Sequence, residues 1–154
     1  YHMPYTHSLV GSVCFAIGFA AIVWLATRDR RVSLLAGLVV LSHWSLDLLV
    51  HRPDLTIAGD PPKYGIELWN YQAIEMPLEL LLTFGALAVF LARTRGPALP
   101  AIVLGAVLLL VQAINWFGPE PEAVRPALSY TAFFAYGLTT LAAWWLGRTR
   151  RAKP

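Results

Sequence analysis

Five long apolar blocks constrain the fold of this chain more than any other feature. They cover residues 9–26, 32–50, 77–92, 98–117 and 127–146. Each is about 16 to 20 residues long, and a helix needs about 20 to cross the hydrocarbon core of a membrane. A soluble helical bundle would need polar faces, which the first, fourth and fifth blocks lack. We therefore predict an all-α, polytopic integral membrane protein with about five transmembrane helices in a single domain, residues 1–154.

The overall composition agrees with this fold class. The chain is 57% hydrophobic and only 14% charged, whereas a soluble domain usually carries about 25% charged residues. No basic region precedes the first block and no small-x-small cleavage site follows it, so we do not interpret it as a cleavable signal peptide. Because the chain begins with Tyr1 and not Met, we expect a processed or fragmentary chain with a segment missing upstream.

The basic residues are distributed unevenly between the two sides of a five-span arrangement. Nine of the twelve lie after the first, third and fifth blocks: Arg28, Arg30, Arg31, Arg93, Arg95, Arg148, Arg150, Arg151 and Lys153. Only one acidic residue, Asp29, lies on that side. The positive-inside rule then predicts an outer N-terminus and a cytoplasmic C-terminus. We interpret the clusters as topology signals and lipid-headgroup contacts, not as a nucleic-acid surface, and expect residues 147–154 to form a flexible basic cytoplasmic tail.

The longest connection is an outer loop at residues 51–76, which contains "HRPDLTIAGDPPKYGIELWNYQAIE". Its prolines and glycines argue against a long helix. Long irregular loops in compact proteins are often functional, although this loop could equally be a simple cap over the bundle. A second outer loop, "FGPEPEAVRP", joins the last two blocks.

The stretch "LSHWSLDLLVH" places ionisable residues at the end of an apolar block. His43, Asp47 and His51 follow one another at intervals of four, which puts them on one stripe of a helix. In the predicted orientation His51 is at the outer surface and His43 is about 12 Å deeper. Ionisable residues inside a membrane span are costly and usually functional, so this stripe is a candidate site.

Other polar residues are expected at the same level of the membrane. His7 precedes the first block, Glu75 and Glu79 lie at the start of the third, and Asn115 lies near the outer end of the fourth. One outward-facing cavity could therefore be lined by His7, His43, Asp47, His51, Glu79 and, less directly, Glu75. Imidazoles and carboxylates are typical ligands of zinc, manganese and iron(II). The single cysteine, Cys14, excludes a thiolate metal cluster and an internal disulfide.

Each of these residues also has a simpler interpretation. His43 and Asp47 can form a hydrogen-bonded pair that joins two helices, and His7 and His51 can be ordinary interfacial or exposed residues. Glu75 is expected to be a solvated loop residue. Asp54 and Asp60 lie among prolines, and we interpret them as turn residues.

Three motifs together resemble a known family. They are "PYTHSLVGS", "GLVVLSHWSLDLLVHRPD" and "YGIELWN" followed by Glu79. They resemble the bacterial membrane-bound metal-dependent hydrolases of the YdjM-like group, and the histidine–aspartate spacing is similar to helix ligands of zinc-dependent phospholipase C. The resemblance covers residues 4–80, with only "NWFGPEPE" weakly similar beyond them. Family members usually carry an additional upstream helix with a histidine and an aspartate, which has no counterpart here.

The resemblance implies a specific site and activity. The metal ligands would be His7, His43 and Asp47, with His51 as a further ligand and Glu79 as general base or hydrogen-bond acceptor. The site would hold one or two divalent ions, with zinc preferred over manganese or iron, which would activate water for hydrolysis of a lipid-like or phosphoester substrate at the bacterial inner membrane. Two other classes stay open, namely a metal-ion or proton conduit and a non-catalytic protein whose polar cluster fixes helix packing.

Overall fold

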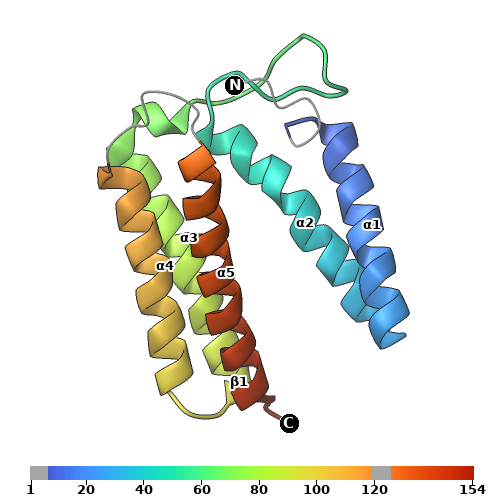
Figure 1. Cartoon of the computed structure of the whole chain (residues 1–154), viewed down its shortest axis with the longest axis vertical. Coiled ribbons are helices and arrows are strands. Elements are labelled where there is room, and N and C mark those ends of the chain that lie inside the picture. The colour runs from blue at the N-terminus through green and yellow to red at the C-terminus, as the bar shows by residue number, and fades with distance from the viewer. Residues whose placement is uncertain (1–6, 119–125) are drawn as a thin grey trace. The chain divides into compact units, whose positions relative to one another are not determined.

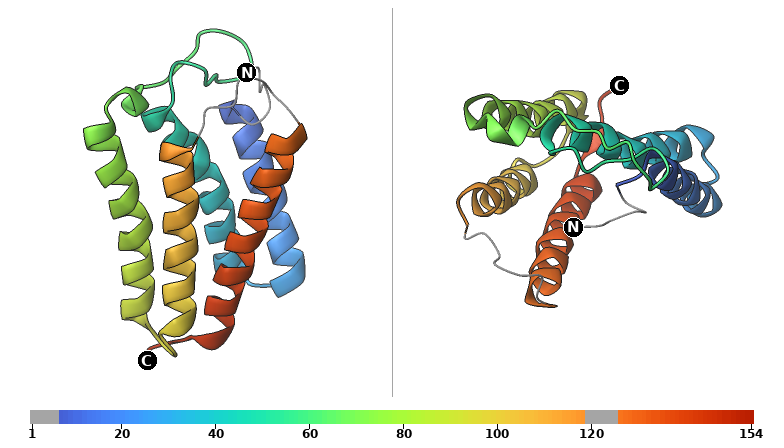
Figure 2. Two further views of the ribbon diagram at one scale, coloured as in Figure 1. Left: turned by 60° about the vertical axis from the view of Figure 1, so that its left-hand side comes forward. Right: turned by 90° about the horizontal axis from the view of Figure 1, so that it is seen from above.

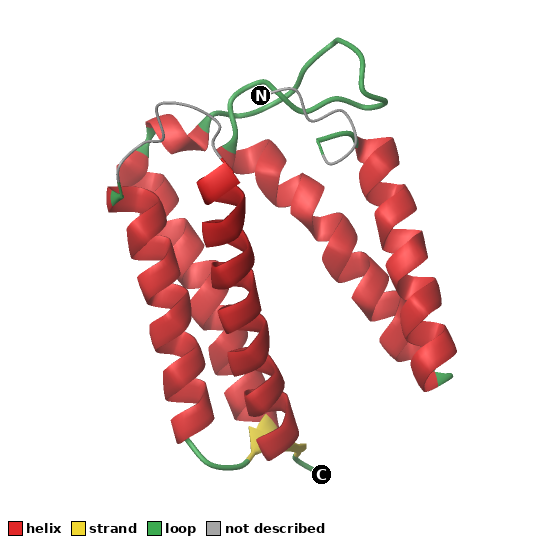
Figure 3. Cartoon of the chain, in the orientation of Figure 1, coloured by secondary structure: helices red, strands yellow, loops and turns green. Residues whose placement is uncertain are grey.

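The computed structural model describes residues 7–118 and 126–154, with the side chains of 126–129 outside that description. These ranges contain five α-helices, one 3₁₀ turn and two short strands (Figures 1 and 3). In chain order they are α1 (Leu9–Thr27), α2 (Arg30–Val50), η1 (Leu68–Asn70), α3 (Gln72–Arg93), β1 (Thr94–Arg95), α4 (Leu99–Phe117), α5 (Pro126–Thr149) and β2 (Arg151–Ala152). The prediction of an all-α fold with five long helices is confirmed.

Four helices, α1 to α4, are long and apolar enough to cross a membrane. Their large apolar side chains are mostly exposed, as in Ile17 of α1, Val39 of α2 and Ile102 of α4. Helices that are apolar on all sides require an apolar surrounding, which lipid supplies. The prediction of a multi-span membrane protein is supported for these four helices. The fifth span and the orientation across the membrane stay predictions.

The chain divides into two compact units, residues 1–78 and 79–154. In the first unit α1 and α2 pack side by side (Figure 1). A Cβ atom at Gly37 of α2 would lie 3.0 Å from the carbonyl oxygen of Ala16 and 3.1 Å from Cβ of Ala20. The absence of a side chain at Gly37 therefore allows the two helices to approach closely.

A tight turn connects α1 to α2. Arg28 adopts a left-handed backbone conformation, with φ at 56°, and its N–H donates to the carbonyl of Trp24 to end α1. Asp29 then caps α2, because its Oδ1 accepts hydrogen bonds from the N–H groups of Arg31, at 2.8 Å, and Val32, at 3.1 Å. These contacts satisfy helix-end groups that would otherwise lack partners. The segment "TRDRR" therefore forms a short connection between the two helices.

The second unit contains α4, α5 and most of α3 (Figure 2). Its buried core combines Ala101 and Leu104 of α4 with Ala142 and Leu146 of α5. Side chains of α3 and α4 pack against this core: Leu87, Leu91 and Leu108. Small alanines at the centre allow close helix contact, as is typical of membrane bundles.

The basic tail is ordered, so the expectation of a flexible tail is wrong. Helix α5 continues to Thr149, and β2 pairs antiparallel with β1 (Figure 3). The guanidinium of Arg150 donates to the carbonyls of Thr94 and Pro97, each at 3.0 Å, and Nζ of Lys153 donates to the carbonyl of Ala92, at 2.7 Å. The tail is fixed because it satisfies carbonyl groups left unpaired where α3 ends.

Helix α3 begins at Gln72, earlier than the apolar block that starts at residue 77. Pro77 therefore lies inside the helix and not at its start. Because proline has no N–H, the carbonyl of Ala73 lacks its usual helical partner. The outer loop ends correspondingly sooner. Most of the second predicted outer loop, residues 119–125 of "FGPEPEAVRP", lies outside the described residues.

Candidate metal centre

The sequence "HRPD" forms a turn at the end of α2. His51 follows the last helical residue, and its N–H donates to the carbonyl of Asp47 at 2.8 Å. Pro53 cannot continue the helix hydrogen-bond ladder, and the N–H of Asp54 donates to the carbonyl of Arg52 at 2.7 Å. This turn brings the carboxylate of Asp54 next to the imidazole of His51.

The residues after Asp54 hold the start of α1. The N–H of Thr56 donates to the carbonyl of His7 at 2.8 Å, and the N–H of Leu9 donates to the carbonyl of Thr56 at 3.0 Å. The N–H of Val10 donates to the carbonyl of Ile57, also at 3.0 Å. The loop thus supplies acceptors for the first N–H groups of α1. This pairing fixes His7 beside the Asp54 turn.

The motif "YGIELWN" closes the loop over the end of α2. The N–H of Ile66 donates to the carbonyl of Leu48, and that of Glu67 to the carbonyl of His51, each at 2.9 Å. A Cβ atom at Gly65 would lie 2.5 Å from backbone atoms of His51 and Arg52, so only glycine allows this approach. The segment then places the indole of Trp69 on the ring of His51, with centroids 4.5 Å apart and planes 27° from parallel.

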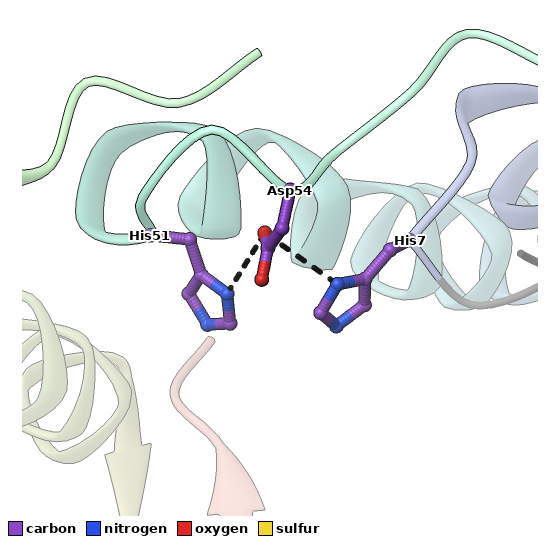
Figure 4. Close-up of side chains that lie close together, drawn as sticks. All are labelled: His7, His51 and Asp54. Carbon is purple, nitrogen blue, oxygen red and sulfur yellow. Dashed lines mark ion pairs between the residues drawn. The ribbon is translucent and has the colours of Figure 1, made fainter. Parts of the chain in front are cut away.

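Three side chains converge at this point (Figure 4). Oδ1 of Asp54 lies 3.6 Å from Nδ1 of His7 and 3.5 Å from Nδ1 of His51. The side chains are partly enclosed, with 15% of His7 and 19% each of His51 and Asp54 exposed. One ligand atom from each residue lies within 4.8 Å of the other two. The group can therefore hold a metal ion.

Two of these ligand atoms are buried without a hydrogen bond. Within the described chain, neither Nδ1 of His51 nor Oδ1 of Asp54 has a hydrogen-bond partner. Leaving a buried polar atom without a partner costs about 1 to 3 kcal/mol. A cation between the two atoms would satisfy both at once.

The spacing also matches that of metal ligands. Zinc lies about 2.0 to 2.2 Å from histidine nitrogen and carboxylate oxygen, so neighbouring ligand atoms of a tetrahedral ion are about 3.4 Å apart. The two nitrogen–oxygen separations, 3.5 and 3.6 Å, are close to this value. Both are long for hydrogen bonds. These separations are therefore compatible with three ligands of one ion.

Asp47 and His43 extend the group along α2. Oδ1 of Asp47 lies 3.9 Å from Nε2 of His51, on the side of the ring away from Asp54, and its Oδ2 lies 3.1 Å from Nε2 of His43. Asp47 is buried, whereas 65% of the His43 side chain is exposed. A carboxylate behind a metal-bound histidine commonly orients the ring. The geometry gives Asp47 this position relative to His51.

The structure therefore brings the predicted residues together in a specific order. His7 and His51 belong to the three-residue group. Asp47 contacts His51, and His43 contacts Asp47. Asp54, which was interpreted as a turn residue, is both a turn residue and a member of the group. The signal for it was its position three residues after His51 in a proline-containing turn.

The environment of Glu75 differs from the expectation, and Glu79 has two hydrogen-bond donors. Glu75 lies in the first turn of α3 with only 1% of its surface exposed, so the expectation of a solvated loop residue is wrong. Glu79 accepts hydrogen bonds at Oε2 from Nε2 of Gln112 and, at 3.0 Å, from Nε1 of Trp116. The catalytic role of Glu79 stays a prediction.

Comparison with known proteins identifies no relative. No family model, no curated protein and no solved structure matches the chain. The resemblance to membrane-bound hydrolases therefore depends on the sequence motifs alone. What the structure adds is the convergence of two histidines and an aspartate at the loop end of α1 and α2.

Proposed function

We propose that this chain is a membrane protein that binds one divalent transition-metal ion through His7, His51 and Asp54 and uses it for hydrolysis. One observation carries the proposal: a buried oxygen of Asp54 lies 3.5 and 3.6 Å from the Nδ1 atoms of the two histidines. The same oxygen has no hydrogen-bond partner within the described residues. This arrangement is what three ligands of one ion require.

The ligand set supports a catalytic site over a structural one. Structural zinc sites use four protein ligands, whereas catalytic sites use three and keep a position for water. Two imidazoles and one carboxylate suit zinc, and manganese or iron(II) are the other candidates. Among the described residues, no fourth histidine, cysteine or acidic side chain belongs to the group. A water or substrate atom would take the remaining position.

The chemistry follows from such a site. A bound ion would lower the pKa of a coordinated water and polarise a phosphoryl or acyl oxygen. Trp69 covers one face of His51 and limits its motion, and Asp47 supports the ring from the opposite edge. Since α1 and α2 are candidate membrane spans, an amphiphilic ester or phosphoester is the substrate class that reaches their ends. The family resemblance also predicts Glu79 as general base, and this role stays a prediction.

The experiment is a metal-dependence assay on the detergent-purified chain. The protein is stripped with a chelator, reloaded with zinc, manganese or iron(II), and tested on a chromogenic carboxylic ester and a chromogenic phosphodiester. We expect turnover only after reloading, and loss of turnover in Asp54→Asn and His51→Ala. Asp60→Asn is the matched control, because Asp60 is an exposed acidic residue of the same loop.

The result also separates the other functional classes. Metal binding without turnover, together with metal-dependent flux in proteoliposomes, would replace the hydrolase with a conduit. If a folded sample shows no metal binding and no turnover, the cluster is only a contact that fixes the loop on α1 and α2.

A further inference from the structure

The second unit has a groove whose lining residues lie between Phe84 and Arg150 and include no histidine. It has a volume of about 600 Å³ and is mostly apolar. Its walls come from α3 and α4: Phe84, Leu87, Leu91, Ile102, Gly105 and Leu109. In a membrane span, such a groove faces hydrocarbon and suits an acyl chain.

One end of this groove is strongly basic. Gly96 and Arg150 line it there, next to the β1–β2 pair. Residues 93–95 and 148–153 carry six basic side chains and no acidic one: Arg93, Arg95, Arg148, Arg150, Arg151 and Lys153. Glu79, near the opposite end of α3, is separated from Arg93 by about 21 Å of helix. The basic end therefore has no nearby acidic residue along α3 to neutralise it.

Two of these arginines are held next to each other. Arg95 and Arg151 are directly paired in the β1–β2 register, and both are exposed. Like charges placed opposite each other in a strand pair are destabilising. An anion between the two guanidinium groups would convert this repulsion into attraction. Arginine side chains bind phosphate through a planar fork of N–H donors that matches its oxygen atoms.

Arg150 explains why the arginine pair stays in place. Its guanidinium donates to Thr94 Oγ1 and to the carbonyls of Leu91, Thr94, Gly96 and Pro97. All of its N–H donors are thereby engaged with α3 and the turn after it. The pairing of β1 with β2 is fixed by a residue that itself lines the groove.

We infer that this unit binds an anionic phospholipid, with one acyl chain in the α3–α4 groove and the headgroup phosphate at Arg95 and Arg151. The apolar groove and the basic rim meet at the same end of α3, which is how the two parts of a phospholipid are joined. Charge complementarity selects an anionic over a zwitterionic headgroup. This inference does not depend on the proposed metal site.

The test measures lipid retention by native mass spectrometry of the full chain in detergent. The probes are dioleoylphosphatidylglycerol and dioleoylphosphatidylcholine at equal concentration. One variant combines Arg95→Gln with Arg151→Gln. The other is Gly105→Leu, whose Cβ would lie 3.5 Å from the ring of Phe84, an ordinary contact, so that the rest of the leucine fills the groove.

The controls apply the same changes elsewhere. Gly85→Leu places a leucine on α3 where a Cβ atom would meet nothing within 4 Å. Arg30→Gln with Arg31→Gln removes two exposed charges from the start of α2. Circular dichroism establishes folding of every variant. If Gly105→Leu does not fold, Ala106→Leu replaces it, because Ala106 also lines the groove and is exposed.

We expect the phosphatidylglycerol to be retained about 10-fold more than the phosphatidylcholine, and to be lost in both test variants but in neither control. Equal retention of the two lipids would overturn the role of the arginine pair. Unchanged retention in the folded groove variant would overturn the role of the groove and leave only adsorption to a basic surface.

Discussion

Oδ1 of Asp54 lies 3.5 Å from Nδ1 of His51, a residue three positions earlier in the chain, and both atoms are buried. Nδ1 of His7 approaches the same oxygen from the start of α1, at 3.6 Å. A local turn thus provides two members of the group, and backbone pairing of the loop with α1 provides the third. The predictions below test whether this group is a metal site and what maintains it.

Asp47→Asn tests whether Asp47 orients His51 or binds the metal itself. We predict that zinc affinity falls by about 10- to 100-fold, as for other carboxylates behind a metal-bound histidine, while full occupancy is still reached at high zinc. Isothermal titration of the chelator-stripped protein measures both quantities. His43→Ala, which removes an exposed partner of Asp47, is expected to have a smaller effect. Failure of Asp47→Asn to bind zinc at any concentration would instead make Asp47 a direct ligand.

Gly65→Ala tests the close approach of the loop to α2. The new Cβ would lie 2.5 Å from backbone atoms of His51 and Arg52, so the backbone must shift. Overpacking of this kind costs about 1 to 3 kcal/mol, and we predict a lower thermal midpoint together with weaker zinc binding. Gly18→Ala is the control, because a Cβ atom there has nothing within 4 Å. Equal midpoints for the two variants would show that the segment does not depend on this approach.

Trp69→Leu tests the stacking on His51. Aromatic pairs contribute about 0.5 to 1.5 kcal/mol beyond burial of their surface, and we predict a loss of zinc affinity of about 2- to 10-fold. The neighbouring Tyr71→Leu is the control, since Tyr71 is exposed and has no described contact with the group. A competition titration with a fluorescent zinc chelator resolves differences of this size. No change in Trp69→Leu would mean that the indole does not position the ring.

Zinc affinity is predicted to decrease as the pH is lowered from about 8 to about 5, because histidine binds metal only in its neutral form and protons compete for the same nitrogens. We expect zinc affinity to fall continuously as the pH decreases. Titrations at several pH values, with the folded fraction followed by circular dichroism, measure it. An affinity that stays constant over this range would exclude His7 and His51 as ligands.

Trp116→Phe tests the hydrogen bond between Glu79 and α4. The indole Nε1 donates to Oε2 of Glu79 at 3.0 Å, and a hydrogen bond between protein groups contributes about 0.5 to 1.5 kcal/mol. We predict a clearly lower thermal midpoint in detergent. Trp144→Phe is the matched control, because Trp144 is exposed. The same midpoint in both variants would show that this bond does not stabilise the pairing of α3 with α4.

The helices could be predicted from sequence because long, uniformly apolar helices have a simple signal. The apolar blocks at 9–26 and 98–117 agree with α1 and α4 to within one residue at each end. The start of α3 was harder to predict from sequence, because its first turn contains Glu75 and precedes Pro77. The ordered tail was also missed, since its pairing depends on contacts of Arg150 with backbone carbonyls far away in the chain.

The site could be predicted only in part. The four-residue spacing of His43, Asp47 and His51 indicated a polar stripe on one helix, and the structure confirms its internal contacts. That spacing says nothing about the residues beyond the helix end. Asp54 enters the group through a turn and His7 through the pairing with Thr56, and neither relationship has a periodic signal.

The most direct measurement is the metal content of the full chain by elemental mass spectrometry, after supplementation with zinc and removal of free metal. We predict about one equivalent in the unmodified protein and in His43→Ala, and almost none in Asp54→Asn or His51→Ala. Metal retained in a folded Asp54→Asn variant but lost in His43→Ala would place the site further along α2. No metal in the folded, unmodified protein would contradict the metal centre altogether.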